Sequence, residues 1–240
     1  MISAVPSPAE ERKANRDQHV ASDKSSTLTA VDILLEPDAS MLKLASGFNA
    51  RLLASIPSPP GFLLDENHRP HITVLQSYVR TTALDEVYET VQGLLATVDL
   101  SSLTLTAHGL AHLEERPSIG ICAIVVSPGP GVLDFQEKLI SALLPYTESG
   151  GTAGAFVRTE AEPAINDKTI EYIEHYVPQH SGAGYVAHVT VGMAKIDDLT
   201  ALEAEPFDPL TFSADAIGIY QLGNNGTAAR KLKSWDSLAK

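Results

Sequence analysis

Cysteine, basic residues and long apolar runs are all scarce in this sequence, and each shortage excludes a class of protein. The single cysteine, Cys122, excludes an internal disulfide and a metal site built from a cysteine cluster. No apolar stretch approaches the roughly 18 residues that a membrane-spanning helix needs. Residues 1–26 lack the apolar segment of a secretory signal. We therefore expect a cytoplasmic protein that does not bind membranes.

The charge balance argues against long nucleic acid as a partner. The chain has 17 Lys and Arg against 30 Asp and Glu, a formal net charge of −13. Binding to a nucleic-acid backbone depends on basic side chains that displace counterions, and this surface offers few of them. A small phosphate ligand held in one local pocket remains compatible with the charge. With 44% hydrophobic and 20% charged residues, the 240-residue chain has the composition of a globular protein.

Several common catalytic motifs are missing. The sequence has no Gly-x-x-x-x-Gly-Lys-Ser/Thr loop and no Gly-x-Ser-x-Gly turn, so neither a P-loop ATPase nor an α/β-hydrolase mechanism has support. His108 and His112 have the spacing of helical zinc ligands. However, the residues before them are typical of a strand, and no Glu follows His108 as the His-Glu-x-x-His pattern requires. We expect no metal site there.

The sequence predicts a disordered tail followed by one folded domain. Residues 1–26 are polar and without periodicity, which predicts a disordered tail, and residues 27–240 form a single domain.

Apolar spacing predicts helices that begin near Asp38, at Leu84, at residue 132 and at residue 170. It predicts strands over 31–35, 71–79, 103–107, 119–126, 185–194, 210–222 and 228–235. Consecutive strands at 103–126 and 210–235 lie too close for crossover helices, so the pattern favours an α+β fold with antiparallel or mixed sheets.

A repeated motif carries the chemistry. His71-Ile-Thr-Val74 and His188-Val-Thr-Val191 share the pattern His-x-Thr-x with β-branched apolar residues at x, about half the chain apart. Because strand side chains alternate between faces, each motif buries its apolar pair and presents an imidazole and a hydroxyl on the other face. A match of this kind is expected by chance about a tenth of a time in such a chain. Two copies therefore indicate a site.

The four polar side chains fit the cleavage of a phosphodiester. Imidazoles titrate near neutral pH, so His71 and His188 can share the roles of general acid and general base. The hydroxyls of Thr73 and Thr190 can donate to the phosphoryl oxygens, where negative charge is stabilised. Arg69 is a further candidate for a phosphate contact, whereas Tyr185 falls on the core face of its strand.

The sequence resembles the 2H phosphoesterase superfamily, which includes bacterial 2'-5' RNA ligase-like proteins and 2',3'-cyclic phosphodiesterases. The two motifs carry the resemblance, with Arg69-Pro-His-Ile-Thr73, the strand that ends Val125-Val-Ser-Pro128, and Tyr220-Gln-Leu222 near the end. It implies a bilobal fold of two similar lobes, each a sheet with outer helices, and one motif strand from each lobe at a central groove. Two features depart from the family pattern: Ala187 stands where proline is frequent, and residues 152–184 form a longer connection that we expect to cover the groove.

The resemblance implies metal-independent hydrolysis of 2',3'-cyclic or 2'-5' phosphodiesters of nucleotides or RNA ends. We expect a monomer without cofactors that acts on such a small substrate, with opening of a 2',3'-cyclic phosphate by water as the favoured reaction. The sequence identifies neither the substrate-binding residues nor which histidine is the base. Two alternatives stay open: a catalytically weak nucleotide-binding module with the same groove, and a zinc hydrolase, which needs a third ligand that the motifs do not supply.

Overall fold

The structure, a computed structural model, describes residues 27–55, 61–66, 68–99, 102–160 and 162–236. The tail predicted for residues 1–26 lies outside the described residues. The chain forms two four-stranded sheets, and every strand pair within them is antiparallel. Sheet A has the order β2-β1-β7-β8, with β1 (Leu28–Pro37), β2 (Ile72–Arg80), β7 (Ala214–Leu222) and β8 (Ala228–Asp236). Sheet B has the order β5-β4-β3-β6, with β3 (Leu105–Arg116), β4 (Ile119–Pro128), β5 (His188–Lys195) and β6 (Leu210–Phe212).

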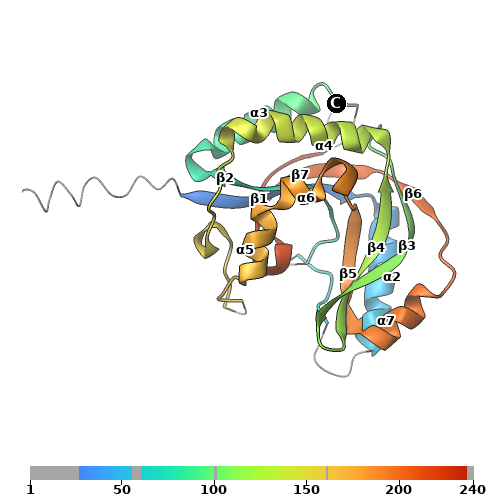
Figure 1. The fold of residues 1–240 in the computed structure, drawn as a ribbon. Coiled ribbons are helices and arrows are strands. Elements are labelled where there is room, and N and C mark those ends of the chain that lie inside the picture. The colour runs from blue at the N-terminus through green and yellow to red at the C-terminus, as the bar shows by residue number, and fades with distance from the viewer. Residues whose placement is uncertain (1–26, 56–60, 67, 100–101, 161, 237–240) are drawn as a thin grey trace, which may run out of the picture.

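The longer helices cover the outer faces of the sheets (Figure 1). Asp38 caps α2 (Ala39–Ser55), because its Oδ1 accepts hydrogen bonds from the backbone N–H groups of Ser40 at 3.0 Å and Met41 at 3.2 Å. α2 follows β1 of sheet A but packs against β5 of sheet B. α4 (Pro130–Leu143) follows β4 of sheet B but contacts β2 of sheet A and lies beside α3 (Leu84–Leu95). This exchange of helices ties the two lobes together.

The order of elements repeats. β1-α2-β2-α3 in the first half corresponds to β4-α4-β5-α7 in the second, where α7 spans Ile196–Glu203. β2 and β1 then occupy the same places in sheet A as β5 and β4 in sheet B. The remaining strands, β7 and β8 of sheet A, take the places of β3 and β6 of sheet B. The predicted α+β fold with two similar lobes is therefore confirmed, and both sheets are antiparallel.

Three elements differ from the sequence prediction. The stretch 210–222, predicted as one strand, is two strands, β6 in sheet B and β7 in sheet A. The other two differences concern β3 and α7. β3 has 12 residues rather than the five predicted, because its second half is mostly exposed and lacks the apolar alternation of a buried strand, although it pairs with β4. α7 was not predicted, since it follows β5 without a break and buries only Leu199 and Leu202. In both cases the apolar pattern is too short to reveal the element.

The longer connection before β5 packs onto the inner face of sheet A. It carries α5 (Asp167–Glu174) and α6 (Tyr176–His180). Ala30, Tyr78 and Leu222 of sheet A form a buried cluster with side chains of this connection, namely Ala155, Phe156, Ile165 and Ile173. The connection thus covers part of sheet A, and its expected position over the groove stays a prediction. No helix among the described residues is both long and apolar enough to cross a membrane.

Candidate active site

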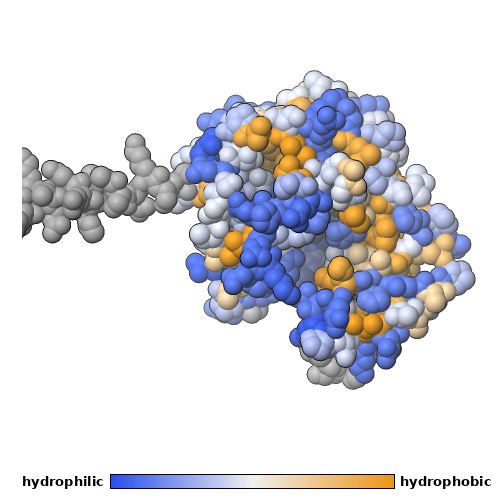
Figure 2. Space-filling view, in the orientation of Figure 1, coloured by the Kyte–Doolittle hydropathy of each residue, from blue (hydrophilic) through white to orange (hydrophobic). Residues whose placement is uncertain are grey.

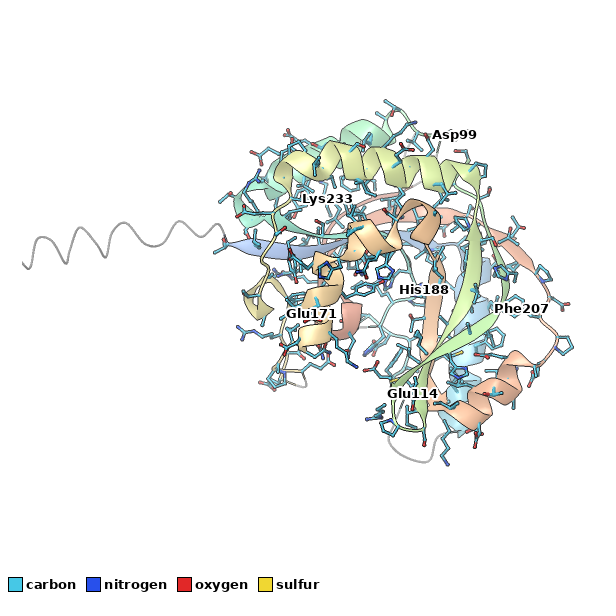
Figure 3. All side chains as sticks on the ribbon, viewed as in Figure 1. Asp99, Glu114, Glu171, His188, Phe207 and Lys233 are labelled. Carbon is cyan, nitrogen blue, oxygen red and sulfur yellow. The ribbon has the colours of Figure 1, made fainter. Side chains whose placement is uncertain are left out.

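The two motifs lie on strands that meet. β2 is the edge strand of sheet A, β5 is the edge strand of sheet B, and the two strands contact each other. His71 immediately precedes β2, and His188 is the first residue of β5. The molecular surface is hollowed between the lobes, and hydrophilic side chains border the opening on the side of α5 (Figure 2). Figure 3 shows His188 at the start of β5.

Both histidine rings are held in the same way by the backbone. His71 Nδ1 lies 2.7 Å from the carbonyl oxygen of Arg69, and His188 Nδ1 lies 2.9 Å from that of Val186. A carbonyl only accepts hydrogen bonds, so each Nδ1 carries a proton and donates it. In the neutral ring the Nε2 atom then has a free lone pair, and it takes a second proton only when the ring is charged. Each histidine therefore presents the nitrogen that a general base or acid needs.

Each motif strand also contains a bulge at its fourth motif residue. In the pairing of β1 with β2, Leu34 is opposite Thr73 and Ile33 is opposite Leu75, so Val74 is the extra residue. The Val74 carbonyl accepts a hydrogen bond of 2.9 Å from Nε2 of Gln136, a buried residue of α4. Bulges re-aim the side chains around them. The bulge at Val74 changes the direction of β2 directly after Thr73.

The second motif repeats this arrangement. In β5, Val191 is the extra residue between Thr190 and Gly192, and its carbonyl accepts a hydrogen bond of 2.8 Å from Nδ2 of Asn49 on α2. Gly192 has φ of 145°, and a Cβ at that position would lie 3.1 Å from the Leu52 side chain. Both motif strands thus have a bulge whose carbonyl accepts a hydrogen bond from a side-chain amide of a helix.

The protonation of the two histidines is linked. Burial lowers the pKa of His188, and the imidazoles of His71 and His180 lower it further, while the Val186 carbonyl and Asp32 act in the opposite direction. The residue is exposed, so its ring can be reached from solvent. His188 is therefore biased toward the neutral form, which a general base requires.

Asp32, on β1, is a member of the site that the sequence analysis did not identify. It has 0% exposure, and its Oδ2 accepts hydrogen bonds from Thr73 Oγ1 at 2.9 Å and Gln76 Nε2 at 3.0 Å. The same oxygen lies 3.6 Å from His71 Nε2. Burial raises the pKa of the Asp32 carboxyl, and His71, Gln76 and Thr73 oppose that shift. The signal in the sequence was one carboxylate inside the apolar run of β1.

The two threonines differ in their partners. The Thr73 hydroxyl donates to Asp32, so it must turn before it can bind a phosphoryl oxygen. The Thr190 hydroxyl makes no hydrogen bond with any residue that the structure describes, and its residue is partly exposed. In this state, Thr190 is the donor that faces the groove without a competing acceptor.

Aromatic side chains lie near the two motifs. The Tyr185 hydroxyl donates to the Thr73 carbonyl at 2.7 Å, which links the start of β5 to β2, while its ring packs on the main core as predicted. Tyr172 of α5 stacks on His180 of α6, with ring centroids 4.6 Å apart, and 40% of Tyr172 is exposed. His180 is close enough to affect the pKa of His188, and Asp32 affects that of Tyr172. The Tyr172–His180 pair therefore offers a flat surface beside the catalytic candidates.

A cavity of about 350 Å³ adjoins His71. Its apolar lining includes Leu34, Tyr220 and Ala228, and its polar lining includes Arg69, Glu36, Asp65, Glu66 and Asp215. Arg69 also supplies the carbonyl that holds the His71 ring. The volume is in the range of small-molecule pockets.

Other candidates from the sequence lie elsewhere. His112 Nδ1 is 2.6 Å from Glu203 Oε1 of α7, and His108 lies on the same strand, β3. Cys122 is buried in β4, where burial raises the pKa of its thiol to about 12. Within the described ranges, no three His, Cys, Asp or Glu residues are grouped as a metal site would require.

Comparison with known proteins gives matches at the level of structure. No family model matches the sequence, and no curated protein matches it. TT0787 of Thermus thermophilus is 12% identical, with a TM-score of 0.52 over 87% of this chain and 97% of that one. E. coli LigT complexed with 3'-AMP is 13% identical, with a TM-score of 0.42 over 89% and 99% of the two chains. Kluyveromyces marxianus Usb1 is 11% identical, with a TM-score of 0.40 over 82% and 95%.

The likeness to the Thermus protein extends over nearly the whole length of that protein. This agreement concerns the fold alone. This chain and the Thermus protein therefore share a fold.

Proposed function

We propose that the protein is a phosphodiesterase that cleaves 2',3'-cyclic or 2'-5' phosphodiesters of nucleotides or RNA ends, without a metal. The observation that carries this proposal is the matched pair of histidines, each with Nδ1–H bound to a backbone carbonyl two residues earlier. Two imidazoles so fixed provide one acid and one base for the same phosphorus atom. Thr190, and Thr73 after it turns from Asp32, are the proposed donors to the phosphoryl oxygens.

The surroundings of the site favour a small nucleotide as substrate. The exposed face of Tyr172 beside His180 suits a nucleobase, because every base can stack on an aromatic ring. The carboxylates around the cavity next to His71, and the net charge of −13, oppose a long polyanionic chain. Water opening a 2',3'-cyclic phosphate needs no second RNA end, and it is the reaction that we favour.

A panel of small phosphodiesters tests the proposal. Purified protein is incubated with 2',3'-cyclic nucleotides and 2'-5' dinucleotides, and both product formation and binding are measured, with and without a chelator. We expect turnover of at least one substrate, unchanged by the chelator and lost in His188→Ala. Binding without turnover would support the nucleotide-binding module instead. Activity that a chelator removes and zinc restores would make the histidines ligands and would refute the acid–base mechanism.

A further inference from the structure

The two halves of the site differ in polarity at one pair of aligned positions. Because Thr73 and Thr190 correspond, and each strand has its bulge directly afterward, the register of β1–β2 can be aligned with that of β4–β5. Leu34 then corresponds to Ala123, and Ile33 to Cys122. One step further, the pair Asp32 and Gln76 corresponds to the pair Ile121 and Met193.

This difference breaks the symmetry between the histidines. Beside His71, the first lobe has a buried carboxylate and an amide. At the equivalent place beside His188, the second lobe has two side chains that carry neither charge nor a strong hydrogen-bonding group. From this we propose that Asp32 is a positioning residue that holds His71 as the protonated general acid and leaves His188 as the neutral general base. The proposal rests on the proposed phosphodiesterase function and assigns the roles within it.

The hydrogen bonds around His71 and Asp32 support this assignment. His71 Nδ1 faces the Arg69 carbonyl at 2.7 Å, and Nε2 faces Asp32 Oδ2 at 3.6 Å, so both ring nitrogens face acceptors, as suits an imidazolium. The 3.6 Å separation is an ion-pair distance but too long for a hydrogen bond, so Nε2–H is free to reach a substrate oxygen. His188 Nδ1 faces the Val186 carbonyl, and its Nε2 has no hydrogen-bond partner in the described part of the chain.

Burial of Asp32 favours a cation beside it. Burial raises the pKa of the Asp32 carboxyl, and the charge of His71 and the donors of Gln76 and Thr73 oppose that shift by stabilising the carboxylate. Oδ2 receives the Thr73 and Gln76 donors, and Oδ1 has no partner among the described residues. No Lys or Arg of the described chain lies within 4.0 Å of this carboxylate, so its one close cation is the His71 imidazolium.

Other ionisable groups also face this pair. Those nearest to it are His188 on β5, Tyr185 before it, Tyr172 on α5 and Tyr176 on α6. Burial raises the pKa of all three tyrosines, so they are uncharged near neutral pH. His180 acts on His188. The cavity beside His71 adds Arg69, Glu36, Asp65, Glu66 and Asp215. Asp32 is distinguished from these carboxylates by its complete burial against the ring.

The reaction then balances as follows. His188 Nε2 takes a proton from water while the water oxygen forms a bond to phosphorus. The bond from phosphorus to one ribose oxygen breaks, and His71 Nε2 gives its proton to that oxygen. His71 ends neutral and His188 ends protonated, and one proton passes through solvent from His188 to His71 before the next cycle.

Titration of the two imidazoles by NMR, in the full chain without substrate, tests the assignment. We expect His71 to keep its second ring proton to higher pH than His188. Asp32→Asn should lower the pH at which His71 loses that proton, because it removes the carboxylate 3.6 Å from Nε2. Asp38→Asn is the matched control, because Asn also caps a helix well and Asp38 bonds only to the start of α2 and to Ser213. It should leave both titrations unchanged.

A second variant keeps the test decisive if Asp32→Asn does not fold. Ile121→Asp places a carboxylate at the corresponding, partly exposed position of β4, and His188 should then keep its proton to higher pH. The proposal is wrong if His188 keeps its proton to higher pH than His71 in the natural protein, or if neither folded variant moves the titration of its own histidine. If the titrations behave as expected but no phosphodiester is cleaved, the proposed function fails and the pairing of Asp32 with His71 stands.

Discussion

The side-chain amide of Gln136 donates a hydrogen bond of 2.9 Å to the carbonyl of Val74, the bulged residue of the first motif. Asn49 does the same for Val191 of the second motif at 2.8 Å. Each amide comes from a helix that begins in the opposite lobe, α4 for β2 and α2 for β5. The exchange of helices between lobes therefore fixes the position of both histidine-bearing strands.

Gln136→Leu should lower the free energy of unfolding by about 1–3 kcal/mol, because it leaves a buried carbonyl without its donor. Urea denaturation measures the loss. Gln92→Leu, an exposed position on α3, is the control and should change stability by less than about 0.5 kcal/mol. Equal stability of the two variants would show that the Val74 carbonyl does not depend on Gln136.

Replacement of either motif histidine should remove most activity. We expect His71→Ala and His188→Ala each to lower the rate by about 10²–10⁴, the usual range for a positioned acid or base. The double variant should lose less than the product of the two, because both groups serve one transition state. His175→Ala, an exposed histidine after α5, is the control. A single variant with nearly full activity would remove that histidine from the mechanism.

The pH profile should show the lowered pKa of His188. A base acts only when unprotonated, so the rate rises with pH as His188 loses its proton. Because burial lowers the pKa of His188, the midpoint of this rise should fall below the ordinary histidine value of 6.5. The measurement is kcat/KM against pH. A midpoint well above 6.5 would contradict the role of His188 as the base.

The two threonines should respond differently to removal of the hydroxyl. Thr190→Val should lower kcat/KM by roughly 10- to 100-fold, the value of one hydrogen bond to a charged group, and leave stability unchanged. Thr73→Val should also destabilise the fold, because it takes a donor from buried Asp32. Steady-state kinetics and urea denaturation of both variants distinguish these effects. Thr190→Val with full activity would exclude that hydroxyl as a phosphoryl donor.

Tyr172→Ala should weaken binding of nucleotides and spare substrates without a base. Base–aromatic stacking is worth roughly 1–3 kcal/mol, so KM for a 2',3'-cyclic nucleotide should rise at least about fivefold. Ethylene cyclic phosphate, which has no base, serves as the matched control substrate. If KM rises equally for both substrates, Tyr172 supports the groove in another way.

The two motifs, the α+β class and the placement of most helices and strands could be predicted from the amino-acid sequence. These follow from local rules: alternation puts His71 and Thr73 on one face of a strand, and Asp38 begins α2 by capping it. The elements that it did not reveal, the second half of β3 and α7, bury too few apolar side chains to leave a periodic pattern.

Tertiary structure alone decided how the two halves differ. Asp32 is one acidic residue in a strand, and only the pairing of β1 with β2 places its carboxylate against Thr73, Gln76 and His71. Likewise, Gln136 and Asn49 are 62 and 142 residues from the carbonyls that they bind, a separation over which no sequence pattern reports contact. Side-chain identity sets what a residue can donate or accept, but the partner depends on the packing of segments distant in the chain. The equivalent histidines thus acquire different surroundings because β1 carries Asp32 where β4 carries Ile121.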